Sequence, residues 1–305
     1  MRLLTHEKQW DGGETVVALG MFDGVHLGHA RLMDKACALA ADGGLTSVVY
    51  TFSSHPMATF APERVPLQLD TRSERIQSIA RTGIDVAVLR PFDKAFASLS
   101  PQAFVRSLCD ALHPRHIVIG FNYSFGCKGA GKAQDMIRLG VEFGFETHVV
   151  EEVSMDGAPV SSTRIRSVIA QGGMQEATAL LGRPYQVCGI VQPGKQLGRQ
   201  LDFPTANLSY PKGKALPPSG VYAARATLRG KTYIAAVNIG SHPTVPEGGE
   251  TIEANLIDYG GEDCYGCHMR LRLYARIRAE KKFESLELLR EEVLRNRGQV
   301  KAFFE

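Results

Sequence analysis

The sequence predicts two consecutive domains: an α/β domain built on a parallel sheet, then a small antiparallel β-barrel followed by a C-terminal helix. Three observations lead to this prediction. Strand-like and helix-like segments alternate up to about residue 150, short strand-like segments separated by Gly and Pro dominate after residue 185, and the chain ends in an amphipathic segment. A length of 305 residues also exceeds what one compact core usually organises.

The N-terminal pattern is a series of strand–helix units. Short β-branched segments predict buried strands at residues 16–19, 47–52, 86–89, 116–119 and 147–150. Apolar residues at helical spacing predict helices between them at residues 29–41, 72–81, 101–112 and 134–143. Such alternation predicts a parallel sheet with helices on both faces. Ligands in this architecture bind at the carboxyl ends of the strands.

The C-terminal pattern is that of an antiparallel barrel. Alternating segments predict strands at residues 187–191, 221–228, 233–238, 252–257 and 269–274. Residues 285–304 predict a helix with one apolar side that we expect to face the barrel, formed by Leu286, Leu289, Val293 and Val300. The change in pattern places the predicted domains at residues 1–185 and 186–305.

Composition excludes several classes of protein. A net charge of +3 is too small to indicate nucleic-acid binding. Residues 1–10 lack the apolar centre of a signal peptide, and no apolar run approaches the roughly 20 residues needed to cross a bilayer. The six cysteines lack the spacing of a disulfide framework, and Cys264 and Cys267 form a CxxC without a second ligand pair. We therefore expect a cytoplasmic protein with reduced thiols and no nucleic-acid or membrane partner; the sequence does not reveal its oligomeric state.

A Gly- and His-rich segment follows the first predicted strand. This segment, GMFDGVHLGHA, begins at Gly20 and leads directly into a predicted helix. Its glycines let the backbone approach a ligand, while His26 and His29 lie where helix N-terminal amides favour phosphate. Either His could instead cap the helix or pack in the core. Because glycines, Asp23 and both histidines occur together at a strand-to-helix turn, we predict an anion site.

A second polar segment, SSTRIR, begins at Ser161. Its hydroxyl groups suit a helix N-cap, and Arg164 and Arg166 could bind phosphate oxygens. Taken alone, this segment is better explained as an ordinary N-cap with surface arginines.

The C-terminal half contains GIVQPGKQLGRQLDFPTAN, which begins at Gly189 and starts like a P-loop. We reject a P-loop because Gln196 replaces the Ser or Thr that would hold Mg²⁺ and no helix follows. We expect a barrel loop instead, in which a turn stiffened by Pro204 presents Thr205 and Asn207. Hydroxyl and amide oxygens of this kind suit Mg²⁺ bridged to ATP phosphates.

Several motifs together indicate a family. GMFDGVHLGH, TFSSHP, GFNYSFG and SSTRIR resemble the FMN adenylyltransferase domain of prokaryotic riboflavin kinase/FAD synthetases, and HxGH resembles the class I nucleotidylyltransferase signature. FPTAN, NIGSHPTV, IEANLIDY and IRAEKKF resemble the riboflavin kinase domain. The resemblance implies a Rossmann-like nucleotidylyltransferase sheet and a barrel of riboflavin kinase type. It also implies an enzyme that uses ATP and Mg²⁺ to convert riboflavin to FMN and FMN to FAD.

The resemblance also implies site residues. For ATP in the adenylyltransferase these are Gly20, Phe22, Asp23, His26, His29, Ser162, Thr163, Arg164 and Arg166. For FMN they are His55, Pro56 and Asn122. For ATP in the kinase they are Gly194, Lys195, Gly198, Thr205 and Asn207, of which Thr205 and Asn207 hold Mg²⁺. The implied catalytic residues are His26, His29, Arg166 and Glu253.

The two reactions make different chemical demands. The FMN phosphate is already ionised, so adenylylation needs positioning and charge stabilisation rather than a base. The riboflavin hydroxyl is neutral and gains from a general base, for which Glu253 matches the family's carboxylate. By pattern alone Glu253 is better explained as an exposed strand residue, and only the resemblance to the family reverses that preference. The sequence departs from the family at Asp202, Asn255 and Asn296, among other positions.

Two alternatives remain open. One is a transferase whose kinase activity is weakened by Asp202 close to the nucleotide loop. The other is a flavin-binding regulator or storage protein without turnover. The presence of Glu253 and of the His26–His29 pair argues against mere binding, which requires neither a base nor two imidazoles at one turn.

Overall fold

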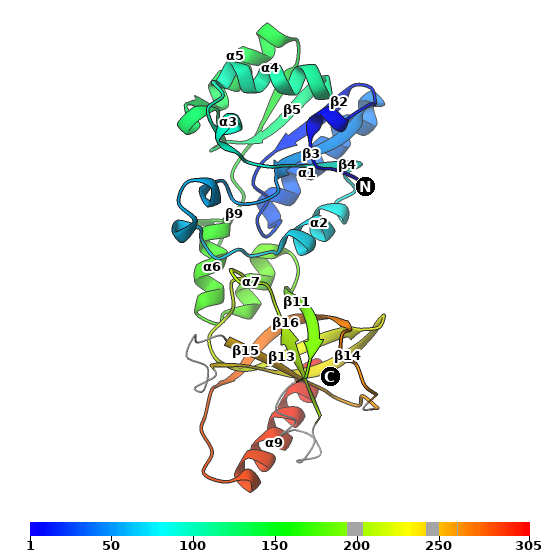
Figure 1. The fold of residues 1–305 in the computed structure, drawn as a ribbon, viewed down its shortest axis with the longest axis vertical. Coiled ribbons are helices and arrows are strands. Elements are labelled where there is room, and N and C mark those ends of the chain that lie inside the picture. Colours follow the sequence, from blue (N-terminus) through cyan, green and yellow to red (C-terminus); the bar gives the residue numbers. More distant parts are fainter. Residues whose placement is uncertain (194–203, 242–249, 261) are drawn as a thin grey trace. The chain divides into compact units, whose positions relative to one another are not determined.

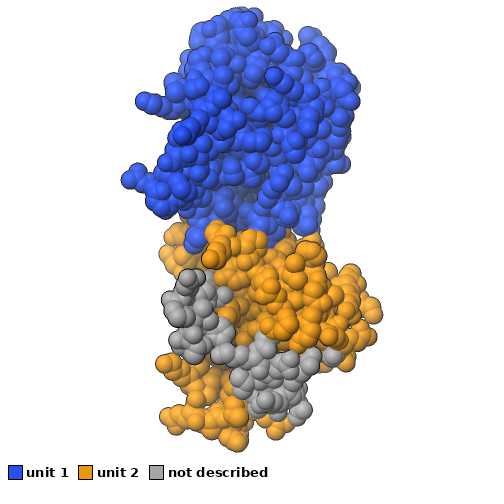
Figure 2. Space-filling view, viewed as in Figure 1, with its two compact units in different colours: residues 1–162 blue, residues 163–305 orange. Residues whose placement is uncertain are grey.

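A computed structural model describes residues 1–193, 204–241, 250–260 and 262–305 (Figure 1). The chain forms two compact units, residues 1–162 and 163–305, which are coloured separately in Figure 2. This division lies earlier than the predicted boundary at 185/186, because the two helices between residues 162 and 181 group with the second unit.

Unit 1 is built on a six-stranded parallel sheet in the order β1-β4-β3-β2-β5-β8. Its strands are β1 (Arg2–Leu4), β2 (Thr15–Leu19), β3 (Thr46–Phe52), β4 (Val86–Arg90), β5 (Pro114–Gly120) and β8 (Glu146–Val150). The five predicted strands are confirmed. The short strand β1, which was not predicted, extends the sheet beside β4.

Helices cover both faces of this sheet. Alternate residues of β2 point to opposite faces of the sheet. On one face, Val16 packs with α1 (Leu27–Gly43) and α2 (Arg72–Ala80). On the other face, Val17 packs with α4 (Pro101–Leu112) and α5 (Ala133–Phe143). The four predicted helices are therefore confirmed. The shorter elements are η1 (Glu7–Gln9), η2 (Pro56–Thr59), η3 (Pro62–Arg64), α3 (Lys94–Ala97), η4 (Cys127–Gly129) and the strand pairs β6 (Ser124–Phe125) with β7 (Gly131–Lys132) and β9 (Ser154–Met155) with β10 (Ala158–Pro159).

The strand order of unit 1 reverses at β2. From β2 the chain adds β3 and β4 on one side, and later adds β5 and β8 on the other. Connections that leave in opposite directions open a crevice at the carboxyl ends of the two strands, here β2 and β5, and this is where such sheets bind ligands.

Unit 2 is a closed antiparallel barrel in the order β11-β12-β15-β14-β13-β16. Its strands are β11 (Tyr185–Gln192), β12 (Thr205–Ser209), β13 (Gly220–Leu228), β14 (Lys231–Ser241), β15 (Glu250–Leu256) and β16 (His268–Ala279). The predicted barrel strands are confirmed. The strand β12 was not predicted: Thr205 and Asn207, which we expected a turn at Pro204 to present, lie on this strand, and its alternation buries Ala206 and Leu208.

The described residues from 162 onward form three helices. α7 (Met174–Leu181), which follows α6 (Ser162–Ala170), packs on β11 and β16. α9 (Leu286–Phe304) packs on β13, β14 and β16, and its buried Val300 contacts the outer face of the barrel. The expectation that Leu286 faces the barrel was wrong: its side chain is exposed because it occupies the first position of the helix.

All six cysteines are free thiols. In the part of the chain that the structure describes, every helix is too short or too polar to traverse a membrane.

Candidate active sites

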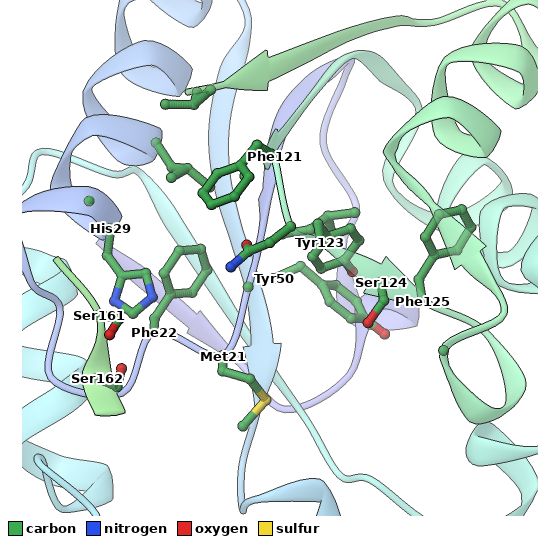
Figure 3. Close-up of a pocket in the computed structure, with 18 of the residues that line it drawn as sticks. Met21, Phe22, His29, Tyr50, Phe121, Tyr123, Ser124, Phe125, Ser161 and Ser162 are labelled. Carbon is green, nitrogen blue, oxygen red and sulfur yellow. The ribbon is translucent and has the colours of Figure 1, made fainter. Parts of the chain in front are cut away.

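Unit 1 contains a cavity of about 740 Å³ at the carboxyl ends of β2 and β5. Its walls come from the loop that follows β2, the segment that follows β5 and residues 150–162. In Figure 3, His29, Phe22, Ser161 and Ser162 gather at one side of the view, and Tyr50, Tyr123 and Phe125 lie toward the other. The cavity therefore has a polar end and an aromatic end.

The polar end is formed by two stacked imidazoles at the start of α1. His26 is the N-cap residue, and its Nδ1 accepts a hydrogen bond from the backbone N–H of His29 (3.4 Å). The two rings stack with centroids 3.7 Å apart, and the Phe22 ring meets His29 edge-on. Gly28 makes room for this arrangement, since a Cβ there would lie 3.2 Å from the His26 ring. Imidazole N–H groups are thus added to the amides of a helix N-terminus, where anions bind.

The loop before α1 is held in an unusual conformation. Phe22 and Val25 have φ values of 51° and 38°, which are strained for residues with side chains. The Asp23 carboxylate accepts hydrogen bonds from the backbone N–H groups of Leu69 (3.0 Å) and Asp70 (3.2 Å). These bonds hold the strained loop against the segment that contains Leu69 and Asp70. The Asp23 side chain is almost fully buried.

The aromatic end is formed by residues from several strands and loops. They are Tyr50, Phe52, Phe92, Phe96, Phe104, Tyr123 and Phe125. Phe52 and Phe92 pack edge to face with centroids 4.9 Å apart, whereas Tyr123 and Phe125 stack at 5.9 Å. Burial raises the pKa of the Tyr50 and Tyr123 hydroxyls, so both rings stay neutral. Flat, uncharged walls of this kind suit a planar aromatic ligand.

Most of the predicted adenylyltransferase residues of unit 1 line this one cavity. They are Gly20, Phe22, His26, His29, Pro56, Asn122 and Ser162. Two others are used differently. The carboxylate of Asp23 binds backbone amides, and the His55 side chain caps η2 by accepting from the N–H of Met57 (3.2 Å).

Three residues of this set lie on α6 and belong to unit 2: Thr163, Arg164 and Arg166. Thr163 is exposed, and Arg164 forms an ion pair with Glu176 of α7 (3.1 Å). Arg166 is half-buried on the same helix. Ser162, the first residue of α6, donates a hydrogen bond from its hydroxyl to the Asp23 carbonyl (2.9 Å).

In unit 2 the strand register brings three polar residues together. Glu253 of β15 lies directly opposite Asn207 of β12 on one side and Asn238 of β14 on the other. Directly opposed side chains share one face of the sheet, with Cβ atoms roughly 4.5–5.5 Å apart. Because their neighbours Ala206 and Ala254 are buried, these polar side chains occupy the outer face. Thr205 lies two residues before Asn207, on the same face.

Two positions that depart from the family pattern have structural roles on this outer face. Asn255 donates to the carbonyl of Pro204 (3.1 Å) and accepts from Arg297 of α9 (2.9 Å). Asn296 of α9 accepts from Arg278 of β16 (3.1 Å). The Arg297–Asn255 bond joins α9 to β15, the strand of Glu253, and the Arg278–Asn296 bond joins α9 to β16. The predicted residues Gly194, Lys195 and Gly198, together with Asp202, lie outside the described residues.

Comparisons with known proteins agree with this division into two sites. A family model for FAD synthetase matches residues 8–164, and one for riboflavin kinase matches residues 181–304. A bifunctional riboflavin kinase/FMN adenylyltransferase from Listeria monocytogenes is 35% identical over 97% of this chain and 94% of its own length. The chain belongs to the bifunctional riboflavin kinase/FMN adenylyltransferase family. The Bacillus subtilis member is 36% identical over 95% of this chain and 93% of its own length.

One solved structure has the same fold throughout. It is a crystal structure described as a macrolide-efflux protein from Streptococcus pneumoniae, with a TM-score of 0.89 and 31% identity. The likeness covers 98% of each chain. The Rossmann-like sheet and riboflavin kinase-type barrel are therefore confirmed together with the family.

The bifunctional enzyme makes flavin cofactors, phosphorylating riboflavin to FMN and adenylylating FMN to FAD at the expense of ATP. Sequence reasoning missed the aromatic end of its cavity. A signal was present, since Phe52, Phe92 and Tyr123 each end or closely follow a predicted parallel strand. Carboxyl ends of parallel strands meet at one edge of the sheet, so aromatic residues at several such ends indicate a shared wall.

Proposed function

We propose that the two reactions use separate sites: adenylylation of FMN in the cavity of unit 1, and phosphorylation of riboflavin beside Glu253 on the barrel. The observation that carries the first assignment is the cavity's combination of a paired imidazole end and an aromatic end. FMN and ATP each join a planar ring system to a phosphate group, so both kinds of wall are needed.

In the adenylylation reaction, an FMN phosphate oxygen attacks the α-phosphorus of ATP and pyrophosphate leaves. His26 and His29 would donate hydrogen bonds to the ATP phosphates as charge develops, with Arg166 as a further cation. The aromatic end, Pro56 and Asn122 would hold the flavin. No side chain has to remove a proton, so catalysis rests on holding the two anions in line.

Several residues have supporting roles in this proposal. Gly20, Phe22 and Ser162 line the cavity and would shape the ATP site. Thr163 and Arg164 would contact ATP from α6. Asp23 and His55 would act by fixing the ATP loop and the flavin-side segment, as their backbone hydrogen bonds suggest.

In the phosphorylation reaction, Glu253 would remove the proton of the ribityl hydroxyl as its oxygen attacks the γ-phosphorus of ATP, and ADP would leave. Thr205 and Asn207 offer a hydroxyl and an amide oxygen on the same face as Glu253, a donor set that fits Mg²⁺. Bound Mg²⁺ would neutralise phosphate charge. Gly194, Lys195 and Gly198 would approach the ATP phosphates.

We also propose that the enzyme works in the cytoplasm. ATP is the substrate of both reactions, and six free thiols are compatible with a reducing compartment.

The test is to separate the two activities with one substitution in each site. Glu253→Gln should reduce riboflavin phosphorylation by roughly 10²–10⁴-fold through loss of the base. His29→Ala should reduce FAD formation from added FMN by about 10²-fold, because the ATP phosphates lose a hydrogen-bond donor. Chromatography of FMN and FAD after separate incubations with riboflavin or FMN measures each step.

Matched controls are His268→Ala and Glu287→Gln, which change exposed residues outside both sites. Both controls should keep both activities. If each active-site variant lost both reactions to the same extent, separate sites would be contradicted. FAD formation that survives in His29→Ala would remove the proposed role of that imidazole.

A further inference from the structure

A cluster of potential metal ligands lies on the sheet of unit 1, where β5 pairs with the edge strand β8. In the parallel register, His116 pairs with Glu146, and Val118 pairs with His148. Residues two apart in a strand share a face, so His116, Glu146 and His148 project from the same face of the sheet.

The three side chains approach one another closely. His116 Nδ1 and His148 Nε2 are 3.1 Å apart. The Glu146 carboxylate lies 3.5 Å from His116 Nδ1 and 3.7 Å from His148 Nε2. We propose that His116, Glu146 and His148 bind a divalent metal ion of borderline softness, such as Zn²⁺.

The ligand separations fit this assignment. Bonds of about 2.0–2.1 Å in a tetrahedral zinc site place neighbouring ligand atoms roughly 3.4 Å apart. The three observed separations, 3.1, 3.5 and 3.7 Å, lie around that value before any adjustment. Two imidazoles and one carboxylate are also a common zinc ligand set, with the fourth position left to water.

The surroundings allow a metal ion to enter. The Glu146 side chain is 66% exposed, while the imidazoles of His116 and His148 are 24% and 17% exposed. Glu146 is the most exposed of the three side chains, so an arriving cation would reach its carboxylate first.

The cluster is separate from the adenylylation cavity. His116, Glu146 and His148 do not line the cavity; the nearest lining residue on β8 is Val150, two residues beyond His148, which corresponds to roughly 6.6 Å of extended strand. A metal ion at the cluster would join the edge strand β8 to its neighbour β5. We therefore expect it to stabilise the sheet rather than to take part in either reaction.

The test uses the full-length protein, with Zn²⁺ as the probe in equilibrium dialysis and Co²⁺ in visible absorption spectroscopy. Wild-type protein should bind one Zn²⁺ at this cluster, and the Co²⁺ form should show the intense visible bands of a tetrahedral site. Even outer-shell substitutions lower metal affinity by roughly 10–100-fold, so loss of a ligand in His148→Ala should weaken binding at least about 100-fold. Glu146→Gln should weaken it less, because an amide oxygen remains a neutral ligand.

Cys267→Ser and His268→Ala are the matched controls, because they alter the only CxxC in the sequence and a neighbouring exposed histidine. Both should keep the Zn²⁺ affinity of the wild type. Thermal unfolding with saturating Zn²⁺ should show a higher midpoint for the wild type and controls but not for His148→Ala. FAD formation by His148→Ala should remain at the wild-type level and so report that the variant is folded.

The proposal is overturned if the affinity and the Co²⁺ spectrum survive in His148→Ala. It is also overturned if binding disappears in Cys267→Ser, which would place the ion at the thiols, or if the wild type shows no Zn²⁺ binding above that of His148→Ala. The 3.1 Å contact would then be a hydrogen bond between two imidazoles that share one proton.

Discussion

His26 shows how one side chain can serve both structure and ligand binding. Its Nδ1 caps α1, while its ring stacks on His29 and lines the cavity. In the sequence, capping and phosphate binding appeared as alternatives; the structure shows the cap, and a capping ring that lines the cavity is compatible with the proposed phosphate binding. The cap uses Nδ1, one of the two ring nitrogens. The cap also fixes the ring before any ligand arrives, which lowers the entropy lost on binding.

Asp23 gives a prediction at the scale of a single residue. Asp23→Ala should destabilise the protein by roughly 1–3 kcal/mol, because the backbone N–H groups of Leu69 and Asp70 would lose a buried, charged acceptor. Urea denaturation of both proteins measures the difference. A variant with unchanged stability and a raised KM for ATP would instead favour direct contact between Asp23 and the nucleotide.

The individual site residues were predictable to different degrees. The sequence grouped Gly20, His26 and His29 correctly, because residues in one turn are neighbours whatever the rest of the chain does. Motif resemblance brought Asn207 and Glu253 together, which no local rule could have done, since their contact depends on strand register. Nothing local indicated that the Asp23 carboxylate would bind the backbone of a segment about 46 residues away.

At the scale of elements, predictions succeeded where the hydrophobic pattern was long. Buried parallel strands and amphipathic helices carry strong patterns, and those of unit 1 were placed within a few residues. β1 was missed because three residues are too few to show a period. β12 was missed because Pro204 suggested a turn, although a proline directly before a strand is compatible with an extended chain.

The barrel gives a prediction at the scale of a strand. Gly189→Ala should destabilise unit 2 by roughly 3 kcal/mol, because a Cβ on β11 would lie 1.8 Å from the carbonyl oxygen of Ser209 on β12. Gly260→Ala is the matched control, since nothing lies within 4 Å of its new Cβ. Thermal unfolding of both variants compares them. Equal unfolding midpoints for Gly189→Ala and Gly260→Ala would contradict the prediction, because the extra Cβ on β11 would then be accommodated without loss of stability.

At the scale of the whole molecule, the structure divides the chain at 162/163. The first family model ends at residue 164 and the second begins at residue 181. The change in sequence pattern near residue 185 marks the start of the barrel and not the start of the compact unit. α7 belongs with the barrel because Met174, Leu180 and Leu181 are buried in its packing. A boundary between helix-rich and strand-rich sequence cannot reveal on which side such a helix packs.

This difference predicts the behaviour of fragments. A fragment of residues 163–305 should unfold cooperatively. A fragment of residues 186–305 lacks α7 and the buried Tyr185, and should be less stable by about 5 kcal/mol, given roughly 1.5–3 kcal/mol for each large apolar side chain. Circular dichroism during heating distinguishes them. Equal stability of the two fragments would place the functional boundary at 185/186, as the sequence suggested.

The closure of the barrel has a consequence for self-association. Every barrel strand has neighbours on both sides, so the described strands of unit 2 offer no free row of backbone amides to another chain. The open six-stranded sheet of unit 1 ends at β1 and β8, and these borders could be extended by a strand from a second molecule; the pairs β6–β7 and β9–β10 have edges too, but only two residues in each strand. Intermolecular β-pairing in concentrated or stored protein should therefore begin at the N-terminal unit, and a charge added to β1 or β8 should suppress it.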